Sequence, residues 1–259
     1  MVEAVDALGQ DSLRRAVLAA GIDVEPVWLD ETASTNDDAL RLARKDASEW
    51  TVVATGHQTA GRGRLGRSWS DVPGSSLLAS VLLRPKLPPD RAPLLTLLAA
   101  VSMVEACGLP AMGSKWPNDL VVGDRKIGGI LAEAAIDDGV LRHVVIGTGL
   151  NVAASGLPGD RASTSVSTEG GEQDAEGILA RYLGSLRAEY DHHDFPSRVV
   201  ARYQSVCSTL GRRVRATAIG GSPVEGVARD LDEHGSLLIE TEDGIQPIAF
   251  GEIVHLRAT

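Results

Sequence analysis

Gly61-Arg62-Gly63-Arg64-Leu65-Gly66-Arg67 restricts the fold most sharply, because a predicted strand at 51–55 precedes it. The stretch satisfies Gly-x-Gly-x-x-Gly, a pattern that in a dinucleotide-binding fold must open a helix. Here Ser-Trp-Ser-Asp-Val-Pro-Gly follows at 68–74, and this segment cannot form a regular helix. The sequence therefore argues against a dinucleotide-binding fold and predicts a loop between two strands, the second at 76–83.

The composition of this loop indicates what it binds. It holds three arginines, three glycines and no acid, in a chain with a formal net charge of −10. Glycines expose backbone N–H groups and let a loop move, and arginines present forked donors to phosphate or carboxylate. A solvated basic turn is the alternative. We interpret 61–67 as a loop that closes over an anion.

A second motif, KWPND at 115–119, is followed at 126–130 by KIGGI. A two-residue turn within 123–125 would close a hairpin between them. In either possible register Asp119 and Lys126 become cross-strand or diagonal neighbours, and Gly128 leaves room beside them for a ligand. A surface salt bridge beside a turn is the alternative interpretation. The face predicted to be shared comprises Asp119, Val121, Lys126 and Gly128.

Two further motifs are weaker when taken alone. Gly147-Thr148-Gly149-Leu150-Asn151 ends a predicted strand, and a tight turn would explain it equally well. Ser34-Thr35-Asn36 precedes acidic residues and then an apolar stretch, so it is typical of a helix cap. A cap also exposes backbone donors at the start of a helix, so capping and ligand binding are compatible.

The remaining pattern predicts an α/β (α+β) chain with two domains, at 1–208 and 211–259. Strands are expected at 26–31, 51–55, 76–83, 119–122, 126–136 and 140–147. Helices are expected at 11–20, after Ser34-Thr35-Asn36, from an Asp90 cap to Gly108, and over 174–208 with a break near Pro196. Residues 154–173 are expected to form a mobile surface loop. Turns at 220–221, 234–235 and 243–244 predict a small β-barrel after 211.

Bulk composition excludes several classes of function. A pI near 5.1 argues against general nucleic-acid binding, which requires a surplus of cations. Cys107 and Cys207 form no metal or redox pattern and are expected to be buried thiols of a reducing compartment. The sequence shows no secretory signal and no apolar segment long enough to span a bilayer. A soluble, cytoplasmic protein without a membrane partner is expected.

Taken together, the motifs resemble those of the biotin–protein ligase family. The resemblance runs from about Val27 to Val152 in matching order and spacing, and a weaker fit continues through the C-terminal segment. Its monofunctional type, which lacks the N-terminal DNA-binding domain, is the form that the chain resembles. The matching segments are 31–36, 58–69, 115–119, 125–133 and 147–151.

The resemblance implies a fold and a reaction. The fold would be a mixed sheet with helices, like that of class II aminoacyl-tRNA synthetases, followed by an SH3-like β-barrel. Biotin would attack the α-phosphate of ATP to give biotinyl-5′-AMP and pyrophosphate. A specific lysine of a biotin carboxyl carrier domain would then take the biotinyl group and release AMP. ATP and biotin would be substrates, Mg²⁺ would offset phosphate charge, and a closed loop would exclude water.

The resemblance also implies roles for individual residues. Ser34, Thr35 and Gln58 would bind the ureido ring, Asn151 would recognise adenine, and Trp69 would line the pocket beneath the loop. The catalytic residues would be Lys126, Arg64, Lys115 and Asp119. The biotin-binding residues would be Ser34, Thr35, Asn36, Gln58, Gly61, Arg62, Gly63, Trp69, Lys126 and an apolar wall of Gly128, Gly129 and Ile130. The ATP and adenylate contacts would be Arg62, Arg64, Arg67, Trp69, Asn118, Lys126 and Asn151. Metal ligands are not assigned.

Two departures and three rival functions complete the prediction. Leu65 stands where a basic or polar residue is common in the family. Only 33 residues precede Ser34, too few for an operator-binding domain, so no repressor function and no specific DNA partner are expected. A monomer or homodimer is expected.

Three rival functions remain open. They are a lipoate–protein ligase, whose arginine-then-triple-glycine signature is absent, a DNA-binding sensor, and a non-catalytic ligand-binding protein.

Overall fold

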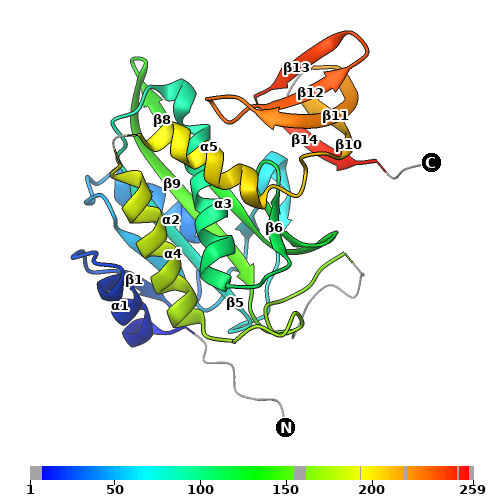
Figure 1. The fold of residues 1–259 in the computed structure, drawn as a ribbon. Coiled ribbons are helices and arrows are strands. Elements are labelled where there is room, and N and C mark those ends of the chain that lie inside the picture. The colour runs from blue at the N-terminus through cyan, green and yellow to red at the C-terminus, as the bar shows by residue number, and fades with distance from the viewer. Residues whose placement is uncertain (1–7, 155–161, 193, 219–220, 250, 257–259) are drawn as a thin grey trace.

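The structure is a computed structural model that describes residues 8–154, 162–192, 194–218, 221–249 and 251–256 (Figure 1). Its main part is a seven-stranded sheet in the order β1-β2-β5-β9-β8-β7-β6. β1 and β2 are parallel and every other pair is antiparallel, so the predicted mixed sheet is confirmed. The strands are β1 (Val27–Leu29), β2 (Val52–Thr55), β5 (Ser76–Leu83), β6 (Met112–Lys115), β7 (Asp119–Val122), β8 (Arg125–Asp137) and β9 (Val140–Asn151).

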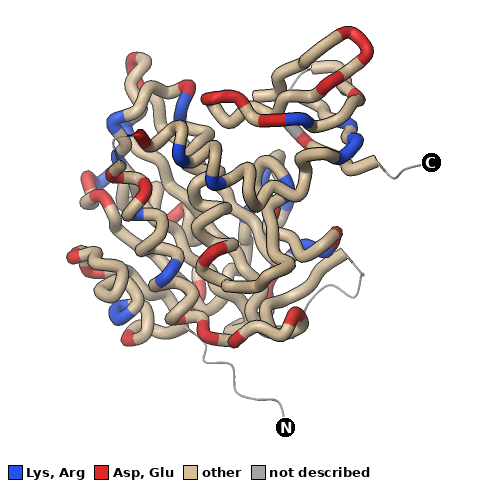
Figure 2. Tube along the Cα trace, in the orientation of Figure 1, with Lys and Arg blue, Asp and Glu red and all other residues tan. Residues whose placement is uncertain are grey.

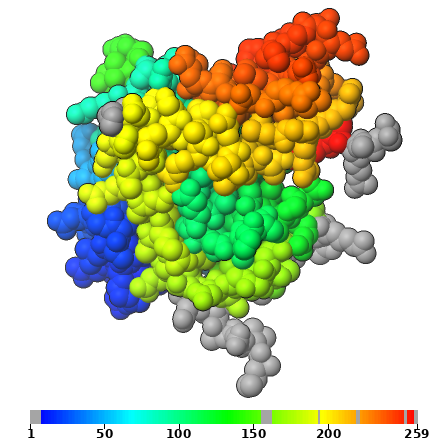
Figure 3. All heavy atoms as spheres, viewed as in Figure 1, coloured from blue at the N-terminus to red at the C-terminus, as the bar shows by residue number. Residues whose placement is uncertain are grey.

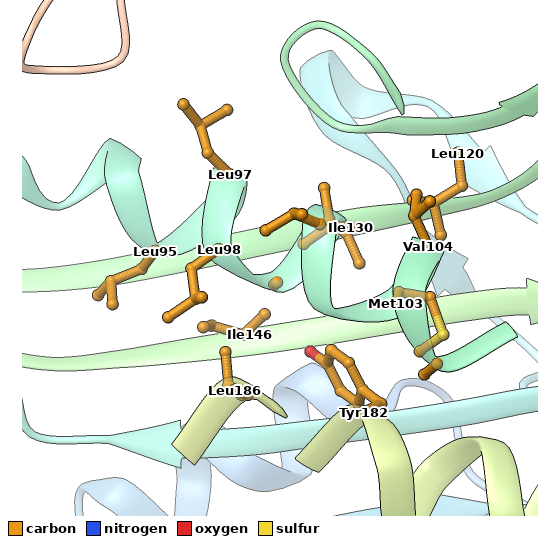
Figure 4. Close-up of a cluster of buried hydrophobic side chains, with 14 of the residues drawn as sticks. Leu95, Leu97, Leu98, Met103, Val104, Leu120, Ile130, Ile146, Tyr182 and Leu186 are labelled. Atoms are coloured by element: carbon orange, nitrogen blue, oxygen red, sulfur yellow. The ribbon is translucent and has the colours of Figure 1, made fainter. Parts of the chain in front are cut away.

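One face of the sheet is covered by helices, and α3 lies at the centre of this layer. The helix is apolar around almost its whole circumference because it contacts the sheet on one side and other helices on the other. Figure 4 shows Leu98, Met103 and Val104 of α3 among Ile130 and Ile146 of the sheet and Tyr182 of α4. Figure 3 shows the outer surface of α4 and α5. The helices of this layer are α1 (Gln10–Ala19), α3 (Pro93–Cys107), α4 (Ala175–Tyr190) and α5 (Phe195–Val206).

The opposite face of the sheet carries α2 (Thr35–Ala43) and the functional motifs. Ala39 and Ala43 of α2 pack there against Val53, Leu82 and Val145. Since side chains alternate along a strand, Gly147 and Gly149 of β9 share the face of Val145, whereas Ile146 and Leu150 face α3. The two glycines therefore leave this face open beside α2.

A second sheet follows α5, with five antiparallel strands in the order β13-β12-β11-β10-β14. We call it the C-terminal sheet (residues 213–255). The turns at 234–235 and 243–244 lie where the sequence predicts them, and residues 219–220 lie outside the described residues. Its strands are β10 (Arg213–Ala218), β11 (Pro223–Leu231), β12 (Leu237–Thr241), β13 (Gly244–Ile248) and β14 (Gly251–His255).

Three local expectations are wrong. Asp90 does not cap α3, because it lies in a separate short helix, η2 (Pro89–Arg91), ahead of the N-cap residue Ala92. The described part of 154–173 is not simply a surface loop, since Thr164, Ser165 and Val166 are fully buried. Residues 155–161 of that loop lie outside the described residues. Cys207 is buried as expected, but Cys107 is partly exposed.

No helix within the described residues has the length and apolarity needed to cross a bilayer.

The helical region predicted at 174–208 forms two helices, α4 and α5, and Pro196 lies in the first turn of α5. The break near Pro196 is therefore confirmed.

Candidate active site

A cavity of about 250 Å³ opens on the α2 face of the sheet. Side chains from the start of α2, the 61–67 loop, the β6–β7 connection, β8, β9 and β14 converge on it. All of the predicted site residues except Gly61, Gly128 and Asn151 line it. The structure thus brings together segments that lie more than a hundred positions apart in the sequence.

One end of the cavity is a buried polar network. Ser34, Thr35 and Asn36 are buried, and Ser80 from β5 lies 2.8 Å from Thr35 Oγ1 and 2.6 Å from Asn36 Oδ1. The Gln58 side-chain oxygen accepts hydrogen bonds from the backbone N–H of Thr35 (2.8 Å) and from its hydroxyl (3.1 Å). Ser34 occupies the N-cap position, but its side chain makes no capping hydrogen bond. The acceptor that caps α2 is instead the side-chain oxygen of Gln58, not a side chain of the predicted cap at 34–36.

The other end of the cavity is cationic. Lys126 Nζ lies 2.6 Å from Asp119 Oδ1, as the predicted hairpin requires. Arg64 Nη1 donates to Asn118 Oδ1 at 3.1 Å, and Asn118 is in turn fixed to the backbone of Ile130 by its Nδ2. Lys115, next to this group on β6, also lines the cavity. This arrangement places fixed positive charge opposite the polar end.

The hairpin register differs from the prediction at one point. Val121 pairs with Lys126, but a bulge then shifts the register, so Leu120 pairs with Gly128 and Asp119 with Gly129. Gly128 consequently lies on the core side, where an added Cβ would meet Leu120 Cδ1 at 3.1 Å. Gly129 is the glycine beside Lys126, with its added Cβ 3.5 Å from the Nζ. The prediction that Gly128 makes room beside Asp119 and Lys126 is therefore wrong.

Ile130 borders the cavity, but its side chain packs on the core side of β8. Its side chain is buried among the core residues that face α3 (Figure 4). Gly61 and Asn151, by contrast, do not line the cavity. Gly61 pairs with Trp69 in the short β3–β4 ladder (β3 Gly61–Arg62, β4 Ser68–Trp69), and Asn151 Nδ2 donates to Thr164 O at 3.0 Å.

The 61–67 loop is a narrow hairpin with a short 3-10 turn, η1 (Arg64–Gly66), at its tip. No regular helix follows it, so the exclusion of a dinucleotide-binding fold is confirmed. Leu65 at the tip has a left-handed backbone, with a φ of 55°, and its side chain is exposed. Arg67 pairs with Glu252 of β14. The loop thus reaches from the cavity to the C-terminal sheet.

Arg62 points to carboxylates rather than to the cationic end. Its guanidinium lies 2.7 Å from Glu133 and 2.6 Å from Asp37. Burial works against its charge, but the hydrogen bond and the charge of Glu133 raise the pKa of Arg62. Glu133 also accepts from Asn36 Nδ2 at 2.7 Å, so this ion pair joins the loop to the polar end of the cavity.

The electrostatics of the cationic end are those of a site prepared for an anion. Burial lowers the pKa of Arg64, and the neighbouring charge of Arg67 lowers it further while Asp119 opposes the shift. Burial likewise lowers the pKa of Lys115, with Lys126 and Arg67 adding to the effect. Cations that are desolvated beside other cations gain most from a bound anion.

Trp69 closes the cavity against β9. A Cβ added to Gly149 would lie 2.7 Å from the Trp69 ring, and one added to Gly147 would lie 2.0 Å from Asn36 Oδ1. Both glycines are therefore needed for the close approach of these side chains. The Trp69 indole N–H is buried and has no hydrogen-bond acceptor within the described residues, so it is a donor available to a ligand.

Several residues that build the site have no predicted role. Ser80 could have been recognised as a polar residue inside the apolar run 76–83. Glu133 falls within the matching segment 125–133, but no role was predicted for Glu133 itself. Asp71 is also unpredicted: its carboxylate accepts from Gln58 N at 3.3 Å and lies 2.9 Å from His57 Nδ1. Glu252, Ile253 and Val254 line the cavity from β14, and no local pattern indicates that approach.

Comparison with known proteins agrees with this geometry. Residues 28–151 match the sequence model of the Biotin/lipoate A/B protein ligase family, and residues 209–256 match that of the biotin protein ligase C-terminal domain. The first match defines the class of protein as a ligase of the biotin and lipoate type. The second match, described as a biotin protein ligase domain, covers the C-terminal sheet.

Individual relatives narrow the assignment. The chain is 34% identical to the biotin–[acetyl-CoA-carboxylase] ligase of Mycobacterium tuberculosis, over 96% of each protein. It is 35% identical to the bifunctional ligase/repressor BirA of Bacillus subtilis, over 88% of this chain and 73% of that protein. The Aquifex aeolicus biotin protein ligase in complex with biotin and ATP superposes with a TM-score of 0.71 at 28% identity, covering 90% of this chain and 99% of that one. The chain belongs to the biotin protein ligase family, which confirms the resemblance of its motifs, the predicted fold class and the expectation of a ligase.

Proposed function

We propose that the chain forms biotinyl-5′-AMP from biotin and ATP in this cavity and then transfers biotin to a lysine of a biotin carboxyl carrier domain. The observation that carries the proposal is one cavity with a buried polar network at one end and clustered cations at the other. Biotin has a polar ureido ring at one end and a carboxylate at the other, and the two ends of the cavity match them.

The polar end suits a cyclic urea. Such a ring presents one carbonyl acceptor and two N–H donors, and a buried site must satisfy all three. Ser34 and Thr35 supply hydroxyl groups, and Gln58 supplies an amide whose oxygen already caps α2. Asn36 is held by Ser80 and Glu133, which supports a positioning role for it beside the ring.

The cationic end suits the adenylation step. A carboxylate oxygen attacks the α-phosphorus, the bond from that phosphorus to the bridging oxygen breaks, and pyrophosphate leaves. Both reactants are anions, so preorganised cations lower the barrier. Lys126, Arg64 and Lys115 converge there, and Asp119 and Asn118 orient two of them. Arg67 and Trp69 belong to the loop that would cover the adenylate and exclude water.

Mg²⁺ is part of the proposal because it neutralises polyphosphate charge. Mg²⁺ sites at nucleotides use one or two carboxylates together with phosphates and waters, and dedicated protein cages are uncommon. The described residues contain no group of three or more His, Cys, Asp or Glu arranged for a metal. Asp119 and Glu252 are the carboxylates that line the cavity and could hold the ion, which fits that sparse pattern.

In the transfer step the uncharged amine of the acceptor lysine attacks the biotinyl carbonyl. An amide bond forms as the amine nitrogen gives up one proton to solvent, the bond from the carbonyl carbon to the phosphate oxygen breaks, and AMP leaves with the pair of electrons. Retention of the adenylate until the acceptor arrives is then the task of the loop. We propose no specific DNA partner: Lys and Arg are interspersed with Asp and Glu along the trace in Figure 2, and the net charge is −10.

The test is to incubate the full chain with ATP, Mg²⁺, an acceptor carrier domain and either biotin or lipoate, and to weigh the acceptor by mass spectrometry. The proposal expects addition of a biotinyl group to one acceptor lysine only when biotin and ATP are both present. Release of biotinyl-5′-AMP without acceptor should also be detected. Modification with lipoate in place of biotin would refute the proposed substrate.

A further inference from the structure

The segment 115–119, which carries Lys115 and Asp119, is held from outside its own sheet. The Trp116 backbone N–H donates to Thr209 Oγ1 at 3.0 Å, and its indole N–H donates to Gly235 O at 3.0 Å. Trp116 itself is buried. Gly235 lies in the C-terminal sheet and Thr209 lies just before it. The cationic end of the cavity therefore rests on this second part of the molecule.

Thr209 is in turn fixed by His255 of β14. The Thr209 hydroxyl oxygen lies 3.1 Å from His255 Nε2, and His255 Nδ1 lies 3.1 Å from Arg212 Nη1. A guanidinium can only donate, so Nδ1 must accept, which places the imidazole proton on Nε2. Nε2–H then donates to Thr209 Oγ1. Arg212 therefore donates to His255, and His255 donates to Thr209. The Thr209 hydroxyl oxygen also accepts a hydrogen bond from the Trp116 backbone N–H.

The neutral state of His255 agrees with this order. Burial and the nearby charges of Lys115 and Arg212 lower the pKa of His255 to about 4. The ring is therefore uncharged near neutral pH and can accept from Arg212. Arg212 is itself oriented by Asp124, whose Oδ1 lies 2.8 Å away. Thr209 is fully buried, so the hydroxyl has no competing water.

We propose that Thr209 and His255 are positioning residues for adenylate formation: the C-terminal sheet acts through them to hold the Lys115–Asp119 segment in its reactive geometry. This inference rests on the proposed function. Neither residue lines the cavity, and the polar end is built from α2 and the segment after β2. Removal of the hydrogen bonds of Thr209 should therefore slow adenylation and leave the affinity for biotin unchanged.

The experiment uses two conservative pairs in the full chain. Thr209→Val removes the acceptor with little change of shape, and Thr209→Ser restores it. His255→Gln keeps an N–H donor near the Nε2 position, whereas His255→Asn retains only an acceptor near Nδ1. Thr217→Val is the matched control, because Thr217 is an exposed residue of β10. Biotin-dependent pyrophosphate exchange, the Kd of biotin by calorimetry and urea unfolding are measured for each.

Thr209→Val and His255→Asn should reduce the exchange rate about tenfold, because a displacement near 1 Å can cost about a hundredfold in rate and here only one anchor is lost. Thr209→Ser, His255→Gln and Thr217→Val should stay within about twofold of the unmodified chain. The Kd of biotin should change less than twofold throughout. If Thr209→Val does not fold, the His255 pair alone decides.

Equal exchange rates in His255→Asn and His255→Gln, both folded, would overturn the inference. A rise in the Kd of biotin that accounts for the whole loss would also overturn it, since the effect would then reach the polar end. An unmodified chain with no biotin-dependent exchange would refute the proposed function and this inference with it. Exchange in the unmodified chain with no effect of the variants refutes the inference alone.

Discussion

Lys126 Nζ lies 2.6 Å from Asp119 Oδ1 across the β7–β8 hairpin, at the point where a bulge interrupts the strand register. A bulge re-aims the side chains next to it. Here it puts Gly129 beside Lys126 and sends the Gly128 position into the core. The ammonium is thus held by one carboxylate at the edge of an open cavity, where a second, negatively charged ligand can reach it.

Lys126→Ala should abolish most adenylate formation and leave the fold intact. Loss of one preorganised charge of this kind costs roughly 10²–10³-fold in rate, and Lys126 is partly exposed, so no core contact is removed. Pyrophosphate exchange measures the effect, with Lys45→Ala, an exposed lysine beyond α2, as the control. A folded Lys126→Ala variant with exchange within a few-fold of the unmodified chain would show that the assignment is wrong.

Gly149→Ala should weaken biotin binding about tenfold or more. The added methyl group would lie 2.7 Å from the Trp69 ring, so the ring and the β4 end of the loop must move away from β9. Calorimetric titration with biotin gives the change in Kd. Gly184→Ala in α4 is the control, because its added Cβ has no neighbour closer than 4.0 Å. Equal affinities of the two variants would contradict the packing argument.

The site as a whole could be predicted only where its chemistry is local. The strand at 76–83 coincides with β5, and the Asp119–Lys126 pair follows from side-chain alternation. The bulge is not visible in the sequence, because a glycine pair tolerates either register. For the same reason the predicted register put Gly128 beside Lys126, where the ladder places Gly129, a residue that the family resemblance also included among the biotin contacts.

The contribution of the C-terminal sheet could not be predicted at all. Glu252 and Val254 reach the cavity, and Thr209 anchors Trp116, only because two separate sheets pack together. Such contacts join positions about a hundred residues apart. Neither the periodicity of hydrophobic residues nor the residues typical of turns can predict them. At Asp90 a local pattern was misleading. Asp90 resembles a helix cap in the sequence, but it lies in the short helix η2, and α3 begins only at Pro93.

The stability of the chain should fall in mild acid partly through His255. Its pKa is about 4 in the folded chain because burial and nearby cations disfavour the charged ring, and about 6.5 in the unfolded chain. Between these values the unfolded state binds more protons, so stability is lost as pH falls from about 6.5 towards 4. The His255→Gln variant has no titrating group at this position and therefore does not lose stability in this way. Urea unfolding of both chains at pH 7, 6 and 5 should show the free energy of unfolding of the unmodified chain falling relative to that of His255→Gln, and parallel pH profiles would contradict the prediction.

No sequence-specific binding to promoter DNA is expected. Neutralisation of phosphates needs a concentration of Lys and Arg, whereas the chain has a net charge of −10 and its basic residues are interspersed with acidic ones (Figure 2). Fluorescence anisotropy at physiological salt, with and without biotin and ATP, measures the affinity. A specific Kd tighter than about 10⁻⁸ M, the range of dedicated regulators, would contradict this prediction.

Arg64→Gly should still permit adenylation but should release the intermediate. Lys126 and Lys115 remain at the cationic end, whereas the loop loses the side chain that bonds Asn118 at 3.1 Å and faces the bound phosphate in our proposal. One charge-assisted contact is worth roughly 1.5–3 kcal/mol, so the off-rate of biotinyl-5′-AMP should rise by about one to two orders of magnitude. Freed adenylate would then react with exposed lysines of unrelated proteins. The variant is mixed with biotin, ATP and serum albumin, and the albumin is blotted for biotin, with Arg41→Gly on the outer surface of α2 as the control. Unchanged albumin labelling, in a variant that still makes adenylate, would mean that Arg64 does not retain the intermediate.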